Sequence, residues 1–174
     1  QKYKELLEKN PNFPGIHFAL AGVYYNKIDY TNAEREFRLA LSEDPNLPMA
    51  NYYLADILMR SQRIEQAVPL LQIVIAANPG YMRGYLQLGK CYISQGKVQE
   101  SLNLFLKAVE LDPNEKTAHY QLAQVYAKLG QPEKQQHHLE LFEKLNLQER
   151  EKRNKNKREL LEKALEEQQS TLSK

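Results

Sequence analysis

The side chains best suited to acid–base, nucleophilic or metal chemistry are four histidines and one cysteine in a chain of 174 residues. His137 and His138 are adjacent, so on a helix they point about 100° apart and do not readily share one metal ion. His17 and His119 are far apart in the sequence, and Cys91 has no clear acid–base partner. Phosphate-loop, GxSxG and HExxH motifs are absent from the sequence. We therefore predict structural histidines, a buried cysteine, and a protein without catalysis, metal or cofactor.

The charge balance also narrows the classes of partner. Lys and Arg number 24 against 22 Asp and Glu, and the formal net charge is +2. A nucleic-acid-binding protein normally carries a basic face, whereas the cations of residues 150–158 are interspersed with Glu, which favours a solvated helix. Weak contact of this segment with nucleic acid or anionic lipid is the alternative. No apolar run reaches the roughly 18 residues that span a bilayer, so we expect no nucleic-acid partner and no membrane span.

The elements that would position any site follow from an internal repeat. Four prolines stand 34 residues apart, and each follows Asn or Asp: Asn10-Pro11, Asp44-Pro45, Asn78-Pro79 and Asp112-Pro113. Such dipeptides end helices and begin turns. Two further sets of residues recur at the same interval of 34 residues, and we call each set a column. The leucine column is Leu20, Leu54, Leu88 and Leu122, and the small-residue column is Ala21, Ala55, Gly89 and Ala123. The chain is therefore predicted to contain repeated structural units.

Each unit is predicted to be a pair of helices. Leu20, Ala21 and Tyr24 follow helical spacing, as do Ala33 and Phe37, and turn-forming residues separate the two groups. A small residue in the first helix lets two helix backbones approach closely. One such hairpin cannot bury its apolar side alone, so we expect neighbouring hairpins to stack.

The pattern resembles the tetratricopeptide repeat family. The resemblance implies an all-α, right-handed α-α superhelical solenoid of helix hairpins with a long C-terminal helix. Gln135 stands where the family has a small residue, which suggests that the fourth unit is terminal. The predicted organisation is the end of a preceding repeat at 1–13, repeats at 14–47, 48–81, 82–115 and 116–149, and a charged C-terminal helix or linker at 150–174.

In this family the first helix of each repeat lines a concave groove, and the groove usually binds a peptide of a partner protein. With Leu20, Ala21 and Tyr24 facing inward, helical geometry selects the exposed positions. We expect four apolar side chains to anchor a ligand: Tyr52, Met59, Ile93 and Tyr120. Four charged side chains are expected to set its polarity: Asp56, Arg60, Arg83 and Lys90. The alternative is that these positions only pack helix against helix. The candidate groove residues are Phe18, Gly22, Tyr25 and Asn26; Tyr52, Asp56, Met59 and Arg60; Arg83, Leu86, Lys90 and Ile93; and Tyr120, Gln124 and Lys128.

The predicted function is a non-catalytic scaffold that binds a peptide or a partner surface in this groove. Two alternatives stay open: self-association through exposed repeat ends, and a substrate-selecting segment of a larger enzyme. Some members of the family hold a chaperone's C-terminal carboxylate with Lys and Asn on adjacent first helices. The corresponding places hold Phe18 and Gly22, or Tyr52 and Asp56, so this mode of binding is not expected.

Overall fold

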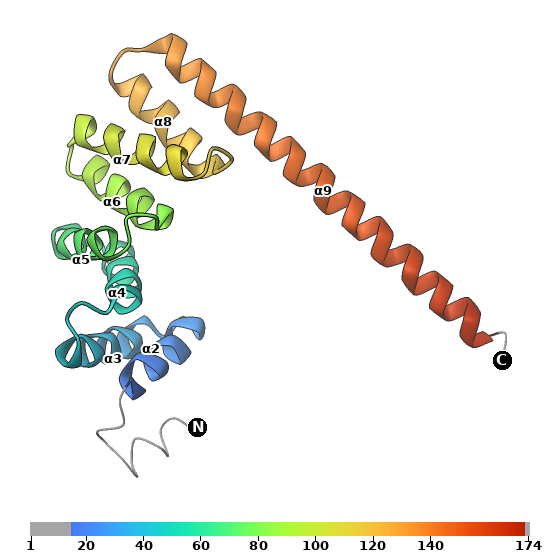
Figure 1. The fold of residues 1–174 in the computed structure, drawn as a ribbon, viewed down its shortest axis with the longest axis horizontal. Coiled ribbons are helices and arrows are strands. Elements are labelled where there is room, and N and C mark those ends of the chain that lie inside the picture. Colours follow the sequence, from blue (N-terminus) through green and yellow to red (C-terminus); the bar gives the residue numbers. More distant parts are fainter. Residues whose placement is uncertain (1–14, 173–174) are drawn as a thin grey trace. The chain divides into compact units, whose positions relative to one another are not determined.

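The computed structural model describes residues 15–172, so the predicted repeat end at 1–13 lies outside the described part. All regular elements between residues 15 and 172 are α-helices (Figure 1). The chain divides into two compact units, Gln1–Pro113 and Asn114–Lys174. The helices of the first unit are α2 (Ile16–Asn26), α3 (Tyr30–Glu43), α4 (Pro48–Arg60), α5 (Ile64–Ala77), α6 (Met82–Ser94) and α7 (Val98–Leu111). The second unit contains α8 (Lys116–Lys128) and α9 (Pro132–Leu172).

Consecutive helices form hairpins, and their turns share one backbone conformation. A residue with positive φ recurs every 34 positions: Ile28 (63°), Gln62 (60°), Gly96 (73°) and Gly130 (67°). Glycine adopts this left-handed conformation without steric cost, whereas Ile28 and Gln62 carry a Cβ that opposes it. The turn therefore reverses the chain at the same point of each repeat and makes the two helices antiparallel.

The columns found in the sequence form the core of the first unit. Leu20, Leu54 and Leu88 are each at most 4% exposed, and Phe37 and Phe105 are fully buried. First and second helices of each hairpin pack against one another, and α3 and α5 also pack against the first helix that follows. The leucines and phenylalanines therefore fill the space between the two helix layers, as the repeat pattern predicted.

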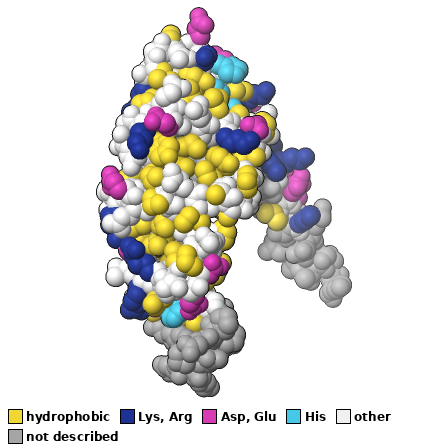
Figure 2. Space-filling model, turned by 60° about the vertical axis from the view of Figure 1, so that its left-hand side comes forward, with side chains coloured by type: hydrophobic (Ala, Val, Ile, Leu, Met, Phe, Trp, Pro, Cys, Tyr) yellow, Lys and Arg dark blue, Asp and Glu magenta, His cyan; other side chains and the backbone are white. Residues whose placement is uncertain are grey.

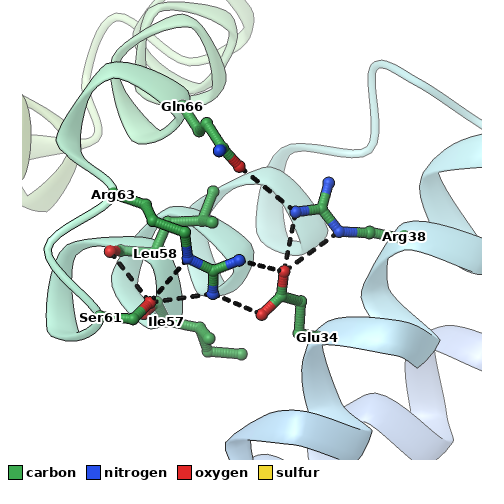
Figure 3. Close-up of polar contacts among 7 residues, drawn as sticks. All are labelled: Glu34, Arg38, Ile57, Leu58, Ser61, Arg63 and Gln66. Atoms are coloured by element: carbon green, nitrogen blue, oxygen red, sulfur yellow. Dashed lines mark hydrogen bonds and ion pairs between the residues drawn. The ribbon is translucent and has the colours of Figure 1, made fainter.

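Neighbouring repeats of the first unit are also joined by an ion-pair network around Glu34 on α3 (Figure 3). Arg63, at the start of α5, donates two hydrogen bonds to the Glu34 carboxylate at 2.8 and 2.6 Å. Arg38 donates to the same carboxylate at 2.8 Å. The bonds from Arg63, and then those from Arg38, hold the pKa of Glu34 below its ordinary value. Paired bonds of this kind fix orientation as well as distance, so the network sets the register of α3 against α5.

At Gly89 the small-residue column leaves space for an aromatic ring, whereas the close approach of a second helix backbone was expected from the sequence. A Cβ added there would lie 2.5 Å from Cε1 of Phe105, which is fully buried and has little room to move. We expect Gly89→Ala to lower the free energy of unfolding by about 1–3 kcal/mol, because overpacking displaces a core ring. Urea denaturation followed by circular dichroism measures this change.

Gly22 provides the control, because it is also a glycine inside a first helix. A Cβ added at Gly22 meets no described heavy atom within 4 Å. Gly22→Ala should therefore stabilise the chain by roughly 0.5–1 kcal/mol through helix propensity alone. Equal effects of the two substitutions would show that the close packing of α6 on Phe105 is wrong.

In the second unit, the long C-terminal helix predicted from the sequence is confirmed. Helix α9 has 41 residues and α8 has 13, so at about 1.5 Å per residue α9 is roughly three times as long. Lys116, the first residue of α8, pairs with Glu149 of α9. The side chains of residues 150–160, which follow this pair, are all exposed. None of the helices in the described part of the chain is long and apolar enough to cross a membrane.

Candidate functional site

Three successive first helices meet at the carboxylate of Asp56. Tyr25 of α2 donates its hydroxyl hydrogen to Oδ2 of Asp56 at 2.6 Å, and Nε of Arg60 donates to the same oxygen at 2.6 Å. Nε2 of Gln87 on α6 donates to Oδ1 at 3.3 Å. These bonds bring one side of α2, α4 and α6 together. We call the side that carries Tyr25, Asp56 and Gln87 the first-helix face.

We call Asp56 and its three hydrogen-bond donors the Asp56 hub. The pKa shifts of its members indicate that the hub is a structural contact. Burial, and then the bond to Asp56, raise the pKa of Tyr25 well above its ordinary value. The same carboxylate raises the pKa of Arg60. Tyr25 is therefore a neutral donor and Arg60 a cation at neutral pH. Asp56 is only 9% exposed and already accepts from three side chains, so it organises the face rather than presenting a free charge.

An open cleft of about 200 Å³ lies on this face between α2 and α4. Tyr25 and Tyr53 have ring centroids 4.9 Å apart, and Tyr53 stacks on Phe37 at 5.7 Å. The backbone of Gly22 leaves space above these rings. The structure thus brings the four sequence-selected positions of α2 to one cavity, whose lining is Phe18, Gly22, Tyr25, Asn26, Phe37 and Tyr53.

Three of the predicted groove residues are less exposed than expected: Asp56, described above, Tyr52 and Leu86. The ring of Tyr52 lies 5.3 Å from Tyr81 and 5.6 Å from Tyr53, and burial raises the pKa of its phenol. Leu86 is only 6% exposed and belongs to the core. The expectation of solvent exposure was wrong for Asp56 and Leu86 and is only partly met by Tyr52, because helical spacing does not include the side chains that cover a residue in the folded chain. The aromatic neighbours that cover Tyr52 come from its own helix and from the start of α6.

The remaining candidates of the first unit keep some access to solvent. Arg60 and Arg83 are exposed, while Met59, Lys90 and Ile93 are partly exposed. In the second unit, α8 carries the last three candidates. Tyr120 is 40% exposed with its ring 5.2 Å from Phe142, and Gln124 and Lys128 are exposed.

Exposed apolar surface alone does not identify the site. Figure 2 shows apolar side chains gathered in patches between charges of both signs. Leu39 on α3 and Leu106 on α7 are 40% and 41% exposed, although both belong to second helices. A second cleft of about 190 Å³ contains Arg63 and Glu34, which already bind each other. The cleft on the first-helix face differs because its aromatic walls are open and uncharged.

A histidine pair that sequence reasoning missed lies in the second unit. Nδ1 of His119 is 3.0 Å from Nδ1 of His138, and the His138 ring stacks on Tyr126 with centroids 5.4 Å apart. The separation of 19 residues equals that between His17 and Glu36, which bond at 2.7 Å in the first repeat. This recurring separation across a hairpin was the available signal. No group of three potential metal ligands occurs among the described residues.

The histidine pair makes stability depend on pH. Burial, and then the neighbouring His119 and His137, lower the pKa of His138 from 6.5 to about 4. Between these values the unfolded chain binds a proton that the folded chain excludes, so stability falls as the pH drops from 6.5 toward 4. We expect a melting midpoint about 2–4 °C lower at about pH 5 than at about pH 7 from this group.

Variants that do not titrate separate the contribution of His138 to this pH dependence from the contribution of the Asp and Glu carboxylates. His138→Asn should reduce the pH dependence, because an amide can hydrogen-bond near the same place without changing charge. The exposed neighbour His137, changed to Asn, should leave most of it in place. An unchanged pH dependence in His138→Asn would show that the pair does not couple folding to protons.

The comparisons with protein families follow the repeats along the chain. A model described as "TPR repeat" matches residues 89–130, and models described as "Tetratricopeptide repeat" match 1–48, 28–80 and 117–149. Together these matches cover most of the sequence. The chain belongs to the tetratricopeptide repeat family.

Solved structures with the same fold include MamA and YrrB. MamA 41-end from Desulfovibrio magneticus RS-1 is 27% identical with a TM-score of 0.78, over 84% of this chain and 82% of that chain. YrrB, described as a TPR protein with an unusual peptide-binding site, is 25% identical with a TM-score of 0.74, over 82% and 74%. A search of curated proteins found no match. The fold is the predicted all-α solenoid class, and family and structures together support a protein–protein interaction scaffold of a typically non-catalytic kind.

Proposed function

We propose that the chain binds an extended peptide segment of a partner protein along its first-helix face. The observation that carries this proposal is the open aromatic cleft beside the Asp56 hub. Accessible aromatic surface is characteristic of interaction sites, and Tyr provides a large contact area at low entropic cost. The peptide-binding site named for YrrB supports the same class of ligand.

The hub favours binding over chemistry. Hydrogen bonds through Asp56 hold three first helices in fixed positions, and such preorganisation reduces the cost of binding. Cys91 is fully buried, and burial raises the pKa of its thiol to about 11, so it is a poor nucleophile at neutral pH. We therefore propose a scaffold that holds a partner without reacting with it.

The proposed repeat boundaries are those expected from the sequence. Each interval contains one hairpin of the described structure: α2 and α3, α4 and α5, α6 and α7, or α8 and the first part of α9. The boundary at residue 149 falls inside α9, so the last repeat continues into the charged segment without a helix break. The proposed repeats are 14–47, 48–81, 82–115 and 116–149, with 150–174 as the charged extension.

Selection from a random peptide library displayed on phage tests the proposed function. Peptides recovered on the wild-type chain should bind it reversibly in fluorescence anisotropy, and unlabelled peptide should compete. Light scattering across protein concentrations tests the self-association alternative, which a monomer that binds peptide would contradict. Failure to recover any saturable binder would contradict peptide binding itself.

A further inference from the structure

Charge is divided unequally between the two helix layers of the first unit. The first helices α2, α4 and α6 carry three cations, Arg60, Arg83 and Lys90, and one carboxylate, Asp56. The second helices carry three cations and six glutamates. The first layer thus has a formal charge of +2 and the second a formal charge of −3.

The cations of the second helices are neutralised within the chain, but two on α6 are not. Arg35, Arg38 and Lys107 each form an ion pair with a glutamate on their own helix. Arg60 pairs with Asp56. Among the described residues, Arg83 and Lys90 form no ion pair within 4.0 Å. A partner carboxylate could therefore pair with either without displacing an existing one.

The two unpaired cations lie on the side of α6 that belongs to the first-helix face. Arg83, Gln87 and Lys90 follow the spacing i, i+4 and i+7, which places them on one side of a helix. Gln87 donates to Asp56, so this side is directed toward the hub. Arg83 is exposed and Lys90 is partly exposed, which leaves both side chains accessible beside Gln87.

We propose that the partner segment is acidic: an apolar side chain enters the cleft at α2, and Asp or Glu side chains reach Arg83 and Lys90 on α6. This rests on the proposed function and names the partner class. Charge complementarity argues for it, since opposite charges increase both association rate and specificity. A nucleic acid would need a longer basic stripe and would gain little from an uncharged aromatic cleft.

The geometry also specifies spacing. From α2 to α6 a ligand crosses two helix-to-helix steps, each on the order of 8–10 Å. An extended chain covers about 3.3 Å per residue, so roughly five or six residues separate the apolar side chain from the first carboxylate. This register distinguishes an acidic peptide that spans the face from one attracted to the cations alone.

The test uses the peptides recovered from the random library and a matched pair of lysine variants. Lys90 and Lys107 are both partly exposed, but Lys107 lies on the second helix α7 and pairs with Glu110. Recovered peptides should be enriched in Asp and Glu. Replacing their acidic residues with Asn and Gln should weaken binding at least about tenfold, and added salt should weaken the acidic form more.

The two variants then locate the effect. Lys90→Glu should weaken binding of the acidic peptide about tenfold and leave the affinity of the Asn/Gln form nearly unchanged. Lys107→Glu should change the affinity of neither peptide. Circular dichroism verifies that both variants are folded. If the recovered peptides bind saturably but are not enriched in Asp and Glu, and if Lys90→Glu does not change their affinity, the acidic-partner inference is wrong. Peptide binding itself would still stand. Absence of any binder would instead overturn the proposed function and the inference with it.

Discussion

Replacing Leu88 with alanine should lower the free energy of unfolding by about 2–5 kcal/mol, the cost of a cavity where a buried leucine was. Leu88 is 2% exposed and belongs to a core cluster whose buried members come from α2 to α6, with Leu104 of α7 packed against it. Because each repeat depends on its neighbours, the loss should also reduce the stability of adjoining hairpins. Chemical denaturation followed by circular dichroism measures the change.

A leucine on the neighbouring helix provides the control. Leu106 on α7 is 41% exposed, so Leu106→Ala removes the same atoms from a partly solvated position. Its cost should stay within about 0.5–1 kcal/mol. Similar losses in the two variants would contradict the register in which the leucine column fills the interior.

Filling the cleft should produce the largest loss of binding. Gly22 lines the cleft, and a Cβ there meets no described atom within 4 Å. Gly22→Leu therefore places an apolar side chain where the ligand's anchor would lie, at no cost to helix stability. We expect the Kd of a library-selected peptide to rise at least about 30-fold, the loss typical of a central anchor site.

Two variants distinguish blocking from other effects. Gly22→Ala changes helix propensity but adds only a methyl group, so it should retain most of the affinity. Gln99→Leu adds the same apolar side chain at an exposed position of the second helix α7 and should bind normally. Full affinity in a folded Gly22→Leu variant would place the ligand elsewhere on the molecule.

The fold was predictable because repetition makes one local pattern recur. The leucine, small-residue and proline columns each predict the same helix hairpin. The residues with positive φ also lie in the turn segments expected from the sequence. Tight packing at Gly89 also followed from its column, although the group that packs there is the Phe105 ring and not a helix backbone. The long C-terminal helix was predictable as well, because strong helix formers continue through residue 149 without a break.

The site was predictable only where it depends on one helix. The four positions selected on α2 line one cleft, because a single helix determines which residues share a side. Gln87 was missed because its role comes from a contact between repeats. Tyr25 to Asp56 and Asp56 to Gln87 are both separations of 31 residues, about one helical turn less than the repeat length.

Amide chemical-shift mapping with a library-selected peptide tests the central claim, that partners bind along the first-helix face. On titration, the shifts should change at the cleft of α2, near Asp56 on α4, and from Arg83 to Lys90 on α6, and the same residues should be unaffected in Gly22→Leu. Saturable changes confined to the outer residues of α3, α5 and α7, or to the charged extension of α9, would contradict it.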